Sequence, residues 1–446
     1  MNRDLASLQS DADAVVNAAI IAAVHGADPM VIVKSPPGAG KTFLAECACA
    51  VATDNPRMKV AIVTPNVAQA YDIVRRLTAY DLPRLIAMHA QHRQLPPDLV
   101  GRVVEQKGWN PAANAGPGIL VGNVHVLAQH LSSLDTHEFD LLIIDEAYQL
   151  EASNLMTVCD LARRILMVGD PGQLPPVQPV DTANLEAAEH KMHRSAPDYV
   201  LDRFPRTPVY ELPVTRRLSA DTTAFVQPAF YWGLPFESVV LDQDRKLDFA
   251  VDGLVPVIDD ALDAVAAGAS IVAITLPGAP PPHAEVDHEL ADVSSRIVER
   301  FLLRQATWRG ERCLRQEDIG CIDPRVVTGG AISRRLRELG LPNVVVDTVE
   351  KWQGLERPVM VVRHPLSTVG RPAPFDLEKG RWCVALSRHQ LGCVVVARAS
   401  VETVIADYLH RSDTAAAGAE DTVWQGFVAH RHIWGELERR GRIFAL

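Results

Sequence analysis

The chain has 446 residues, of which 48% are hydrophobic and 22% charged, and its formal net charge is −11. This length predicts two or three domains with full cores. The negative charge argues against a general nucleic-acid coat, although a local basic groove is compatible with it. The most apolar long stretch, residues 254–276, is interrupted by aspartates and is not expected to span a bilayer. The seven scattered cysteines form no CxxC pair, so we expect reduced thiols and a soluble, cytoplasmic protein.

Residues 8–25 predict an opening helix, which precedes a glycine loop between a strand and a helix. The sequence VIVKSPPGAGKTFLAECACA (31–50) begins as a buried strand, passes two prolines and two glycines, and then turns helical. This is the pattern of a phosphate-binding loop. We expect the backbone N–H groups of residues 38–42 to surround a β-phosphate, Lys41 to bridge the β- and γ-phosphates, and the Thr42 hydroxyl to bind Mg²⁺.

Residues 60–77 and 118–131 each predict a strand followed by a helix. Between them, residues 82–117 are rich in proline and glycine. That composition predicts loops and short pieces in place of a folded insert.

The sequence FDLLIIDEAYQL (139–150) predicts a buried strand that ends in two carboxylates. The carboxyl end of a strand in a parallel α/β sheet faces the ligand crevice. There Asp145 can hold Mg²⁺ and Glu146 can take a proton from an attacking water. The alternative is a strand that ends in two solvated acids.

The sequence RRILMVGDPGQLPPV (163–177) predicts one more strand, followed by a tight turn that carries Asp170 and Gln173. A glutamine at this position is placed to sense the γ-phosphate or to orient water. This second loop favours the catalytic interpretation of Asp145 and Glu146.

These motifs resemble those of the superfamily 1 helicases, specifically the Upf-like branch that includes the nonsense-mediated-decay and senataxin helicases. The first, Ia, second and third motifs of that family are similar, in this order, to SPPGAGKT, TPNVAQAYD, DEAYQ and GDPGQLPP. The second half supplies LPVTRRLSADTTAFVQPAFY (212–231), VDTVEKWQGLE (346–356) and RWCVALSRHQ (381–390), which resemble the fourth, fifth and sixth motifs.

The resemblance implies an α/β fold of two tandem RecA-like P-loop NTPase domains, with parallel β-sheets flanked by helices. It places the first motor domain at residues 1–205, the second at 206–408 and a helical tail at 409–446. It also implies ATP and Mg²⁺ as cofactors, ATP hydrolysis in the cleft between the domains, and 5′ to 3′ movement on single-stranded RNA or DNA.

The resemblance further implies site residues, with Arg217 and Arg388 as arginine fingers for the γ-phosphate. The catalytic residues are then Lys41, Glu146, Gln173, Arg217 and Arg388, and the metal ligands are Thr42 and Asp145. The nucleotide contacts are Gly38, Ala39, Gly40, Lys41, Thr42, Phe43, Arg216, Gly354 and Glu356. The nucleic-acid contacts are Thr64, Pro65, Asn66, Asn123 and Thr348.

The sequence departs from the family at several of its positions. Ser35 replaces the first loop glycine, Asp11 or Ala12 stands at the adenine-sensing glutamine, and Arg216 replaces the tyrosine that stacks on adenine. The serine and arginine after the fifth motif fall on Arg363 and Leu366, and the asparagine of the sixth motif is Cys383. We therefore expect poor discrimination among nucleobases and weakened coupling to nucleic acid. Residues 82–117 are also too few for the β-barrel that the family often inserts.

The tail predicts a helix whose apolar face consists of Trp424, Phe427, Val428, Ile433 and Trp434, with Arg439, Arg440 and Arg442 outside. This helix either packs back on the core, which we favour, or docks a protein partner.

Two other functions stay open from the residues. One is an ATP-gated nucleic-acid-binding subunit that does not unwind. The other is a P-loop kinase for a small molecule, against which the two arginine fingers and the DEAYQ strand argue.

Overall fold

The computed structural model describes residues 5–55, 57–82, 84–110, 116–176, 185, 188–278, 286–368, 372–408 and 422–446. The chain divides into two compact units, Met1–Val214 and Thr215–Leu446. Among the described helices, none is long and apolar enough to cross a membrane.

The first unit alternates strands and helices. Its strands are β1 (Met30–Lys34), β2 (Lys59–Thr64), β3 (Leu85–His89), β4 (Val104–Lys107), β5 (Gly118–Asn123), β6 (Phe139–Asp145), β7 (Ala162–Gly169) and β8 (Val209–Glu211). Its α-helices are α1 (Leu5–His25), α2 (Lys41–Thr53), α3 (Val67–Leu77), α4 (Val124–Ala128), α5 (Ala152–Val158) and α6 (Ala196–Arg203).

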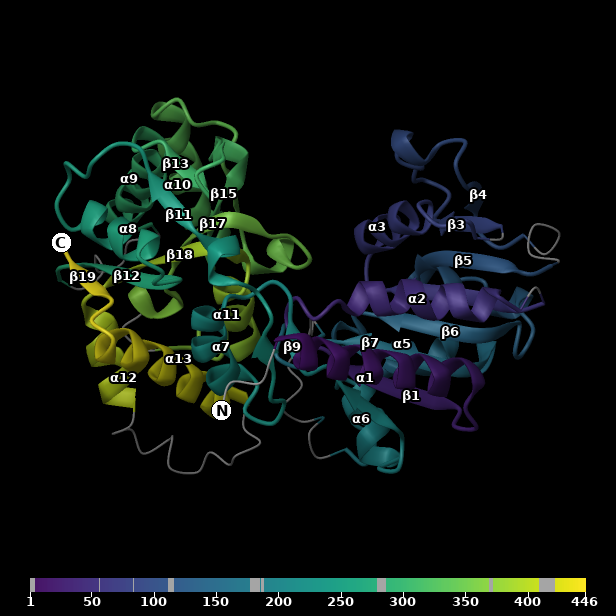
Figure 1. Ribbon diagram of the computed structural model, residues 1–446. Helices are drawn as coiled ribbons and strands as arrows, with labels where there is room; N and C mark the ends of the chain where they lie inside the picture. The colour runs from purple at the N-terminus through teal and green to yellow at the C-terminus, as the bar shows by residue number, and fades with distance from the viewer. Residues whose placement is uncertain are drawn as a thin grey trace. The chain divides into compact units, whose positions relative to one another are not determined.

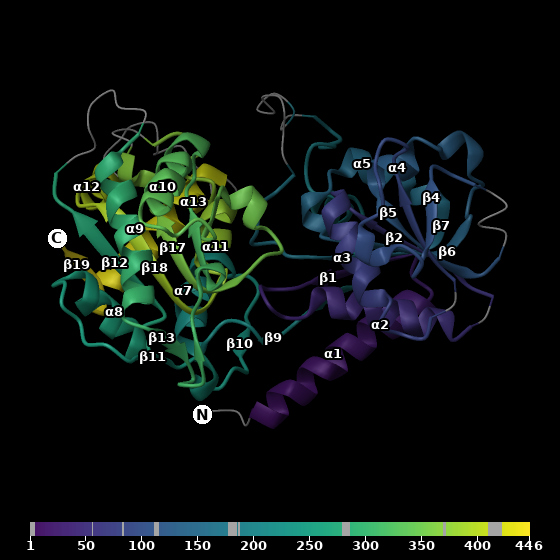
Figure 2. The same ribbon diagram turned by 90° about the horizontal axis from the view of Figure 1, so that it is seen from above.

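All eight strands form one parallel sheet in the order β4-β3-β5-β2-β6-β7-β1-β8. Successive strand residues point to opposite faces, so both faces bury apolar side chains. Helices α1, α2 and α3 cover one face and α4, α5 and α6 the other. Helices α1 and α2 lie side by side (Figures 1 and 2). The expected α/β layers are confirmed.

Residues 82–117 contain more regular structure than their composition predicts. Ile86, Ala87 and Met88 are buried in β3, which pairs with β5, and β4 extends the sheet beyond β3. The apolar residues of β3 were not recognised as a strand from the sequence, because the residues around them are rich in proline and glycine. Residues 85–89 and 104–107 of this segment therefore form one edge of the sheet.

The second unit contains a second parallel sheet, a three-stranded antiparallel sheet and a two-stranded sheet. Its helices are α7 (Ala220–Phe230), α8 (Ile258–Ala266), α9 (His288–Leu303), α10 (Val326–Glu338), α11 (Lys379–Leu386), α12 (Ser400–Tyr408) and α13 (Thr422–Arg439). Its parallel strands are β12 (Ile271–Leu276), β15 (Ile319–Ile322), β16 (Val345–Asp347), β17 (Arg357–Arg363), β18 (His389–Arg398) and β19 (Ile443–Ala445). The short strands are β9 (Val214–Thr215), β10 (Glu237–Ser238), β11 (Leu247–Phe249), β13 (Ala306–Trp308) and β14 (Arg312–Cys313).

The parallel sheet of the second unit has the order β16-β15-β17-β18-β12-β19. Helices α8, α9 and α10 pack on one face with the side chains of β12, β15, β17 and β18. Helix α13 contacts α7, α11 and β12, and these helices lie together beside the sheet in Figure 1. Strand β19, the last element of the chain, forms the sheet edge next to β12.

The C-terminal helix is part of this unit, as favoured from the sequence. Phe427, Ile433 and Trp434 of the predicted apolar face are buried. Val428, by contrast, is 45% exposed, so its assignment to that face was wrong. Helix α13 therefore presents most of its apolar face to the core of its own unit.

Candidate active site

The loop between β1 and α2 has the backbone of a phosphate cradle. Gly38 and Gly40 have φ values of 73° and 93°, which are in the left-handed region that side chains disfavour. The Ser35 N–H donates to the Gly169 carbonyl at 2.9 Å, so the loop is tied to the end of β7. Helix α2 begins after Gly40, and no side chain caps its N-terminus. The N–H groups of its first turn thus suit an anionic ligand.

Two carboxylates lie at the end of β6, next to the first residue of α2. The Lys41 Nζ atom is 2.8 Å from Glu146 Oε1. The Glu146 N–H donates to Asp145 Oδ1 at 3.0 Å, and Gln149 Nε2 donates to Glu146 Oε2 at 3.1 Å. Glu146 has a φ of 56°, which a non-glycine residue rarely adopts. The Lys41–Glu146 ion pair brings together two residues that lie more than one hundred positions apart in the sequence.

The protonation of Asp145 reflects this crowding. Asp145 and Glu146 are both buried. Burial, and after it the negative charge of Glu146, raise the pKa of Asp145 to about 7, against the opposing positive charge of Lys41. A buried carboxyl group with a raised pKa is the kind of group that a cation would stabilise in its charged form. Together with the Thr42 hydroxyl at the start of α2, Asp145 has the donor chemistry that Mg²⁺ prefers.

The loop after β7 adds a second buried polar pair. Gln173 Nε2 donates to Asp170 Oδ2 at 2.5 Å, and the Gly172 N–H donates to Asp170 Oδ1 at 3.0 Å. Both side chains are buried. Asp170 therefore orients Gln173, a relation that the sequence did not reveal.

Four of the five residues predicted to contact nucleic acid lie at the same edge of this sheet. Thr64 and Asn123 end β2 and β5 and are register partners. The Asn123 side chain caps α4 by accepting from Val126 N–H at 3.1 Å, and Thr64 Oγ1 donates to the Asn66 carbonyl at 2.7 Å. Thr64 and Asn123 are buried, whereas Pro65 is half-buried and Asn66 exposed.

In the second unit, Arg217 belongs to a polar cluster with Glu356. Arg217 Nη1 is 3.1 Å from Glu356 Oε2, and Gln390 Nε2 donates to Glu356 Oε1 at 2.7 Å. The Arg217 carbonyl accepts from Arg245 Nη2 at 3.0 Å. Arg217 is half-buried and Arg216 exposed. The Arg388 side chain is only 2% exposed.

Within the second unit, the predicted phosphate and nucleic-acid residues lie at opposite edges of the sheet. Glu356 and Arg388 directly precede β17 and β18, at the amino ends of parallel strands. Thr348 directly follows β16 and thus lies at the carboxyl edge. Gly354, with a φ of 79°, belongs to the turn that leads from one edge to the other.

Two of the departures from the family have structural explanations. Arg363 is 2% exposed and makes a two-pronged ion pair with Asp323, with distances of 2.6 and 2.7 Å. Cys383 is buried, and its Sγ lies 3.3 Å from the Tyr231 hydroxyl. Both side chains thus belong to the core of the second unit.

Comparison with known proteins agrees with the geometry of the first unit. Residues 17–196 match a family model described as an AAA domain. This segment contains the phosphate loop, the Asp145–Glu146 pair after β6 and the loop after β7 that carries Asp170 and Gln173. It is less than half of the chain. The match and the loop geometry together support a P-loop nucleotide-binding domain in the first unit.

No curated protein sequence matches the chain. Among solved structures, the PRRSV helicase is 15% identical, with 86% of this chain and 54% of that chain covered and a TM-score of 0.38. The arterivirus nonstructural protein 10 helicase in complex with DNA is 16% identical, with coverages of 86% and 62% and a TM-score of 0.42. The E. coli DExH-box NTPase HrpB is 12% identical, with coverages of 88% and 42% and a TM-score of 0.43. The chain thus spans less than two thirds of each of these proteins, and likenesses this distant carry no argument about function.

Proposed function

We propose that the chain is an ATP-dependent superfamily 1 helicase or translocase of the Upf-like type that moves 5′ to 3′ on single-stranded nucleic acid. The observation that carries the proposal is the Lys41–Glu146 ion pair at the uncapped start of α2. It joins a phosphate-binding cation to a carboxylate suited to deprotonate water. The order of the motifs along both halves of the sequence supports the helicase assignment.

The Lys41–Glu146 pair suggests how binding prepares the chemistry. Lys41 pairs with Glu146 and offsets its charge. On binding the triphosphate, Lys41 exchanges this carboxylate for the β- and γ-phosphates, which frees Glu146 to accept a proton from water. Thr42 and Asp145 would hold Mg²⁺, which would supply positive charge to the phosphates. Gln173, oriented by Asp170, positions the attacking water.

The remaining nucleotide contacts follow from exposure and charge. The backbone of Gly38, Ala39 and Gly40 holds the phosphates, and the half-exposed Phe43, with 55% of its surface accessible, offers a face to the nucleobase.

The second unit contributes positive charge in this proposal. Arg217 and Arg388 stabilise the transition state, Glu356 and Gly354 shape the loop that holds Arg217, and the exposed Arg216 stacks on the base.

Nucleic acid is bound through backbone contacts at the carboxyl edges of the two sheets. Pro65, Asn66 and Thr348 are accessible enough to touch a strand directly. Thr64 and Asn123 act by shaping the turns that present the backbone N–H groups. Such contacts position a strand without reading its sequence, so RNA and DNA are both candidates.

The second candidate is an ATP-gated subunit that binds nucleic acid without unwinding it. The burial of Arg363 against Asp323 favours it, because this arginine cannot reach a strand while it is paired. A protein partner on the tail would contact Val428 and Trp424, since most of the other predicted docking residues are buried.

ATP turnover with and without single-stranded RNA and DNA, followed by strand separation on a tailed duplex, tests the proposal. We expect turnover that nucleic acid stimulates and duplex separation that requires ATP. Stimulated turnover without separation would favour the second candidate. Absence of turnover under every condition, or transfer of phosphate to an acceptor other than water, would contradict both.

A further inference from the structure

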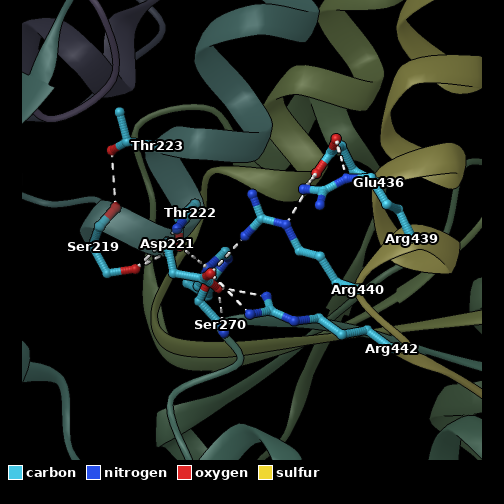
Figure 3. Close-up of polar contacts among 10 residues, drawn as sticks. Ser219, Asp221, Thr222, Thr223, Ser270, Glu436, Arg439, Arg440 and Arg442 are labelled. Carbon is cyan, nitrogen blue, oxygen red and sulfur yellow. Dashed lines mark hydrogen bonds and ion pairs between the residues drawn. The ribbon is translucent and has the colours of Figure 1, made fainter.

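Asp221, in the first turn of α7, accepts hydrogen bonds from two other segments of the second unit (Figure 3). Ser270, which precedes β12, donates to Oδ2 through its N–H at 2.9 Å and its hydroxyl at 2.7 Å. Arg442 donates from both Nη atoms at 2.6 and 2.9 Å, and Arg440 Nη1 donates at 2.9 Å. We call these four residues the Asp221 clamp.

The clamp is half-buried and charged. The side chains of Asp221 and Arg440 are each 23% exposed and that of Arg442 is 17% exposed. Burial acts to raise the pKa of Asp221, but hydrogen bonds from Arg442 and Ser270 outweigh it and lower the pKa. Asp221 therefore stays ionised at neutral pH. Arg440 also pairs with Glu436 at 3.0 Å, which joins the clamp to α13.

Arg440 and Arg442 were expected to lie outside the apolar face of the tail helix, and they are in fact half-buried. The guanidinium of Arg440 lies 4.5 Å from the centre of the Phe225 ring, and that of Arg442 lies 5.4 Å from it. Both arginines thus pack on α7 as well as pairing with it. The two arginines therefore hold α7 in place through their ion pairs with Asp221 and through cation–π contacts with the Phe225 ring.

Helix α7 directly follows the loop that carries Arg217. The Arg217 N–H donates to Thr215 Oγ1 at 3.3 Å, and Ser219 caps the helix by accepting from Thr222 N–H at 3.1 Å. The Thr222 hydroxyl lies 2.9 Å from His389 Nε2, and His389 follows Arg388 in the sequence. The turn that holds Asp221 therefore contacts the segments of both arginines.

We propose that the C-terminal segment, through Arg440 and Arg442, positions Arg217 for ATP hydrolysis, with Asp221 as the residue on which it acts. This inference rests on the proposed role of Arg217. Loss of Arg442 removes the two-pronged restraint on the first turn of α7. A displacement of about 1 Å at a catalytic group costs on the order of 10²-fold in rate. Arg440, Arg442 and Asp221 are positioning residues in this scheme, because none of them needs to touch the nucleotide.

The test is steady-state ATP hydrolysis by the full chain and its Arg442→Gln variant. We expect kcat to fall about ten- to hundredfold, while KM for ATP changes little, since the phosphate loop belongs to the first unit. Arg442→Lys, which keeps the charge but not the fork, should lie between the two. Arg439→Gln is the matched control: Arg439 is 66% exposed, pairs with Glu436 and does not contact Asp221. It should leave kcat unchanged.

A double-mutant cycle that combines Arg442→Gln with Arg217→Ala distinguishes a positioning role of the clamp from a general loss of stability. If the clamp acts through Arg217, Arg442→Gln has no further effect on kcat in the Arg217→Ala background. An equal loss in both backgrounds overturns the inference, as does a wild-type kcat in Arg442→Gln and Arg442→Lys. If Arg442→Gln does not fold, the same cycle is run with Arg442→Lys. A wild-type chain that hydrolyses no ATP overturns the proposed function as well, whereas the former results overturn the positioning role alone.

Discussion

Three histidines of the second unit are buried in their neutral form, and this makes the stability of the unit sensitive to mild acid. His364, His389 and His430 are at most 1% exposed. Burial lowers the pKa of His389 and of His430 to about 3 from the ordinary 6.5. For His364, burial, the neighbouring His430 and Arg363 lower the pKa well below that value. Rings of His364 and His430 lie 5.1 Å apart, so protonating both is unfavourable.

The direction of the pH effect on stability follows from the linkage between proton binding and folding. In the unfolded chain these histidines bind protons near pH 6.5, whereas in the folded unit they do not until far lower pH. Stability is therefore complete above pH 6.5 and is lost as the pH falls below it. Each histidine then costs about 1.4 kcal/mol per pH unit, or about 2 kcal/mol from pH 7 to pH 5. Three together remove roughly 6 kcal/mol, comparable with the whole stability of a domain.

Urea unfolding at pH 7, 6 and 5, followed by tryptophan fluorescence, measures this loss. Trp382 and Trp434 lie against His364, with ring centres 4.8 and 5.4 Å away, and so report on the cluster. His430→Gln should reduce the pH-dependent loss by about a third. The control His288→Gln changes an exposed histidine of α9 and should leave it unaltered. A free energy of unfolding that changes by less than about 1 kcal/mol between pH 7 and pH 5 would refute the reasoning.

Three further predictions concern the nucleotide and the fold. Lys41→Ala should abolish ATP hydrolysis and weaken nucleotide binding in a fluorescence titration, because Lys41 is the cation at the phosphate loop; undiminished turnover would contradict this role. Turnover of GTP, CTP and UTP should lie within about tenfold of that of ATP, or about 1.4 kcal/mol, because Arg216 stands in the base-stacking position; strict ATP preference would reveal a further contact to the base. Gly426→Ala should lower the melting temperature strongly, since the added Cβ would lie 1.4 Å from the Leu377 carbonyl oxygen; an unchanged melting temperature would show that α13 packs differently.

Much of the fold could be predicted because its strands are continuous apolar runs. Residues 141–144 and 165–168 lie in β6 and β7 as expected, since strands buried on both faces leave little room for polar residues. The convergence of Lys41 and Glu146 was predictable for the same reason. Parallel strands deliver the residues that follow them to one edge, and β1, β7 and β6 are neighbours in the sheet.

Other features depend on contacts between residues far apart in the sequence. Nothing near Arg440 or Arg442 signals Asp221, which lies more than two hundred residues earlier. Likewise, the sequence alone suggests that Arg363 is an exposed cation, and only the structure shows its buried ion pair with Asp323. The left-handed backbone of Glu146 leaves no signature in its residue type. Each of these is set by tertiary packing and not by local pattern.

The proposed function requires that Glu146 is the base that activates water. The most direct measurement compares wild-type and Glu146→Gln chains for ATP turnover and for ATP binding in the same preparation. Removing a general base costs about 10²- to 10⁴-fold in rate, whereas the amide keeps the size of the side chain. We therefore predict that Glu146→Gln binds ATP at least as tightly as the wild type, because Lys41 no longer has a carboxylate to pair with, and hydrolyses it at least a hundredfold more slowly. Turnover by Glu146→Gln within a few-fold of the wild type would contradict the account.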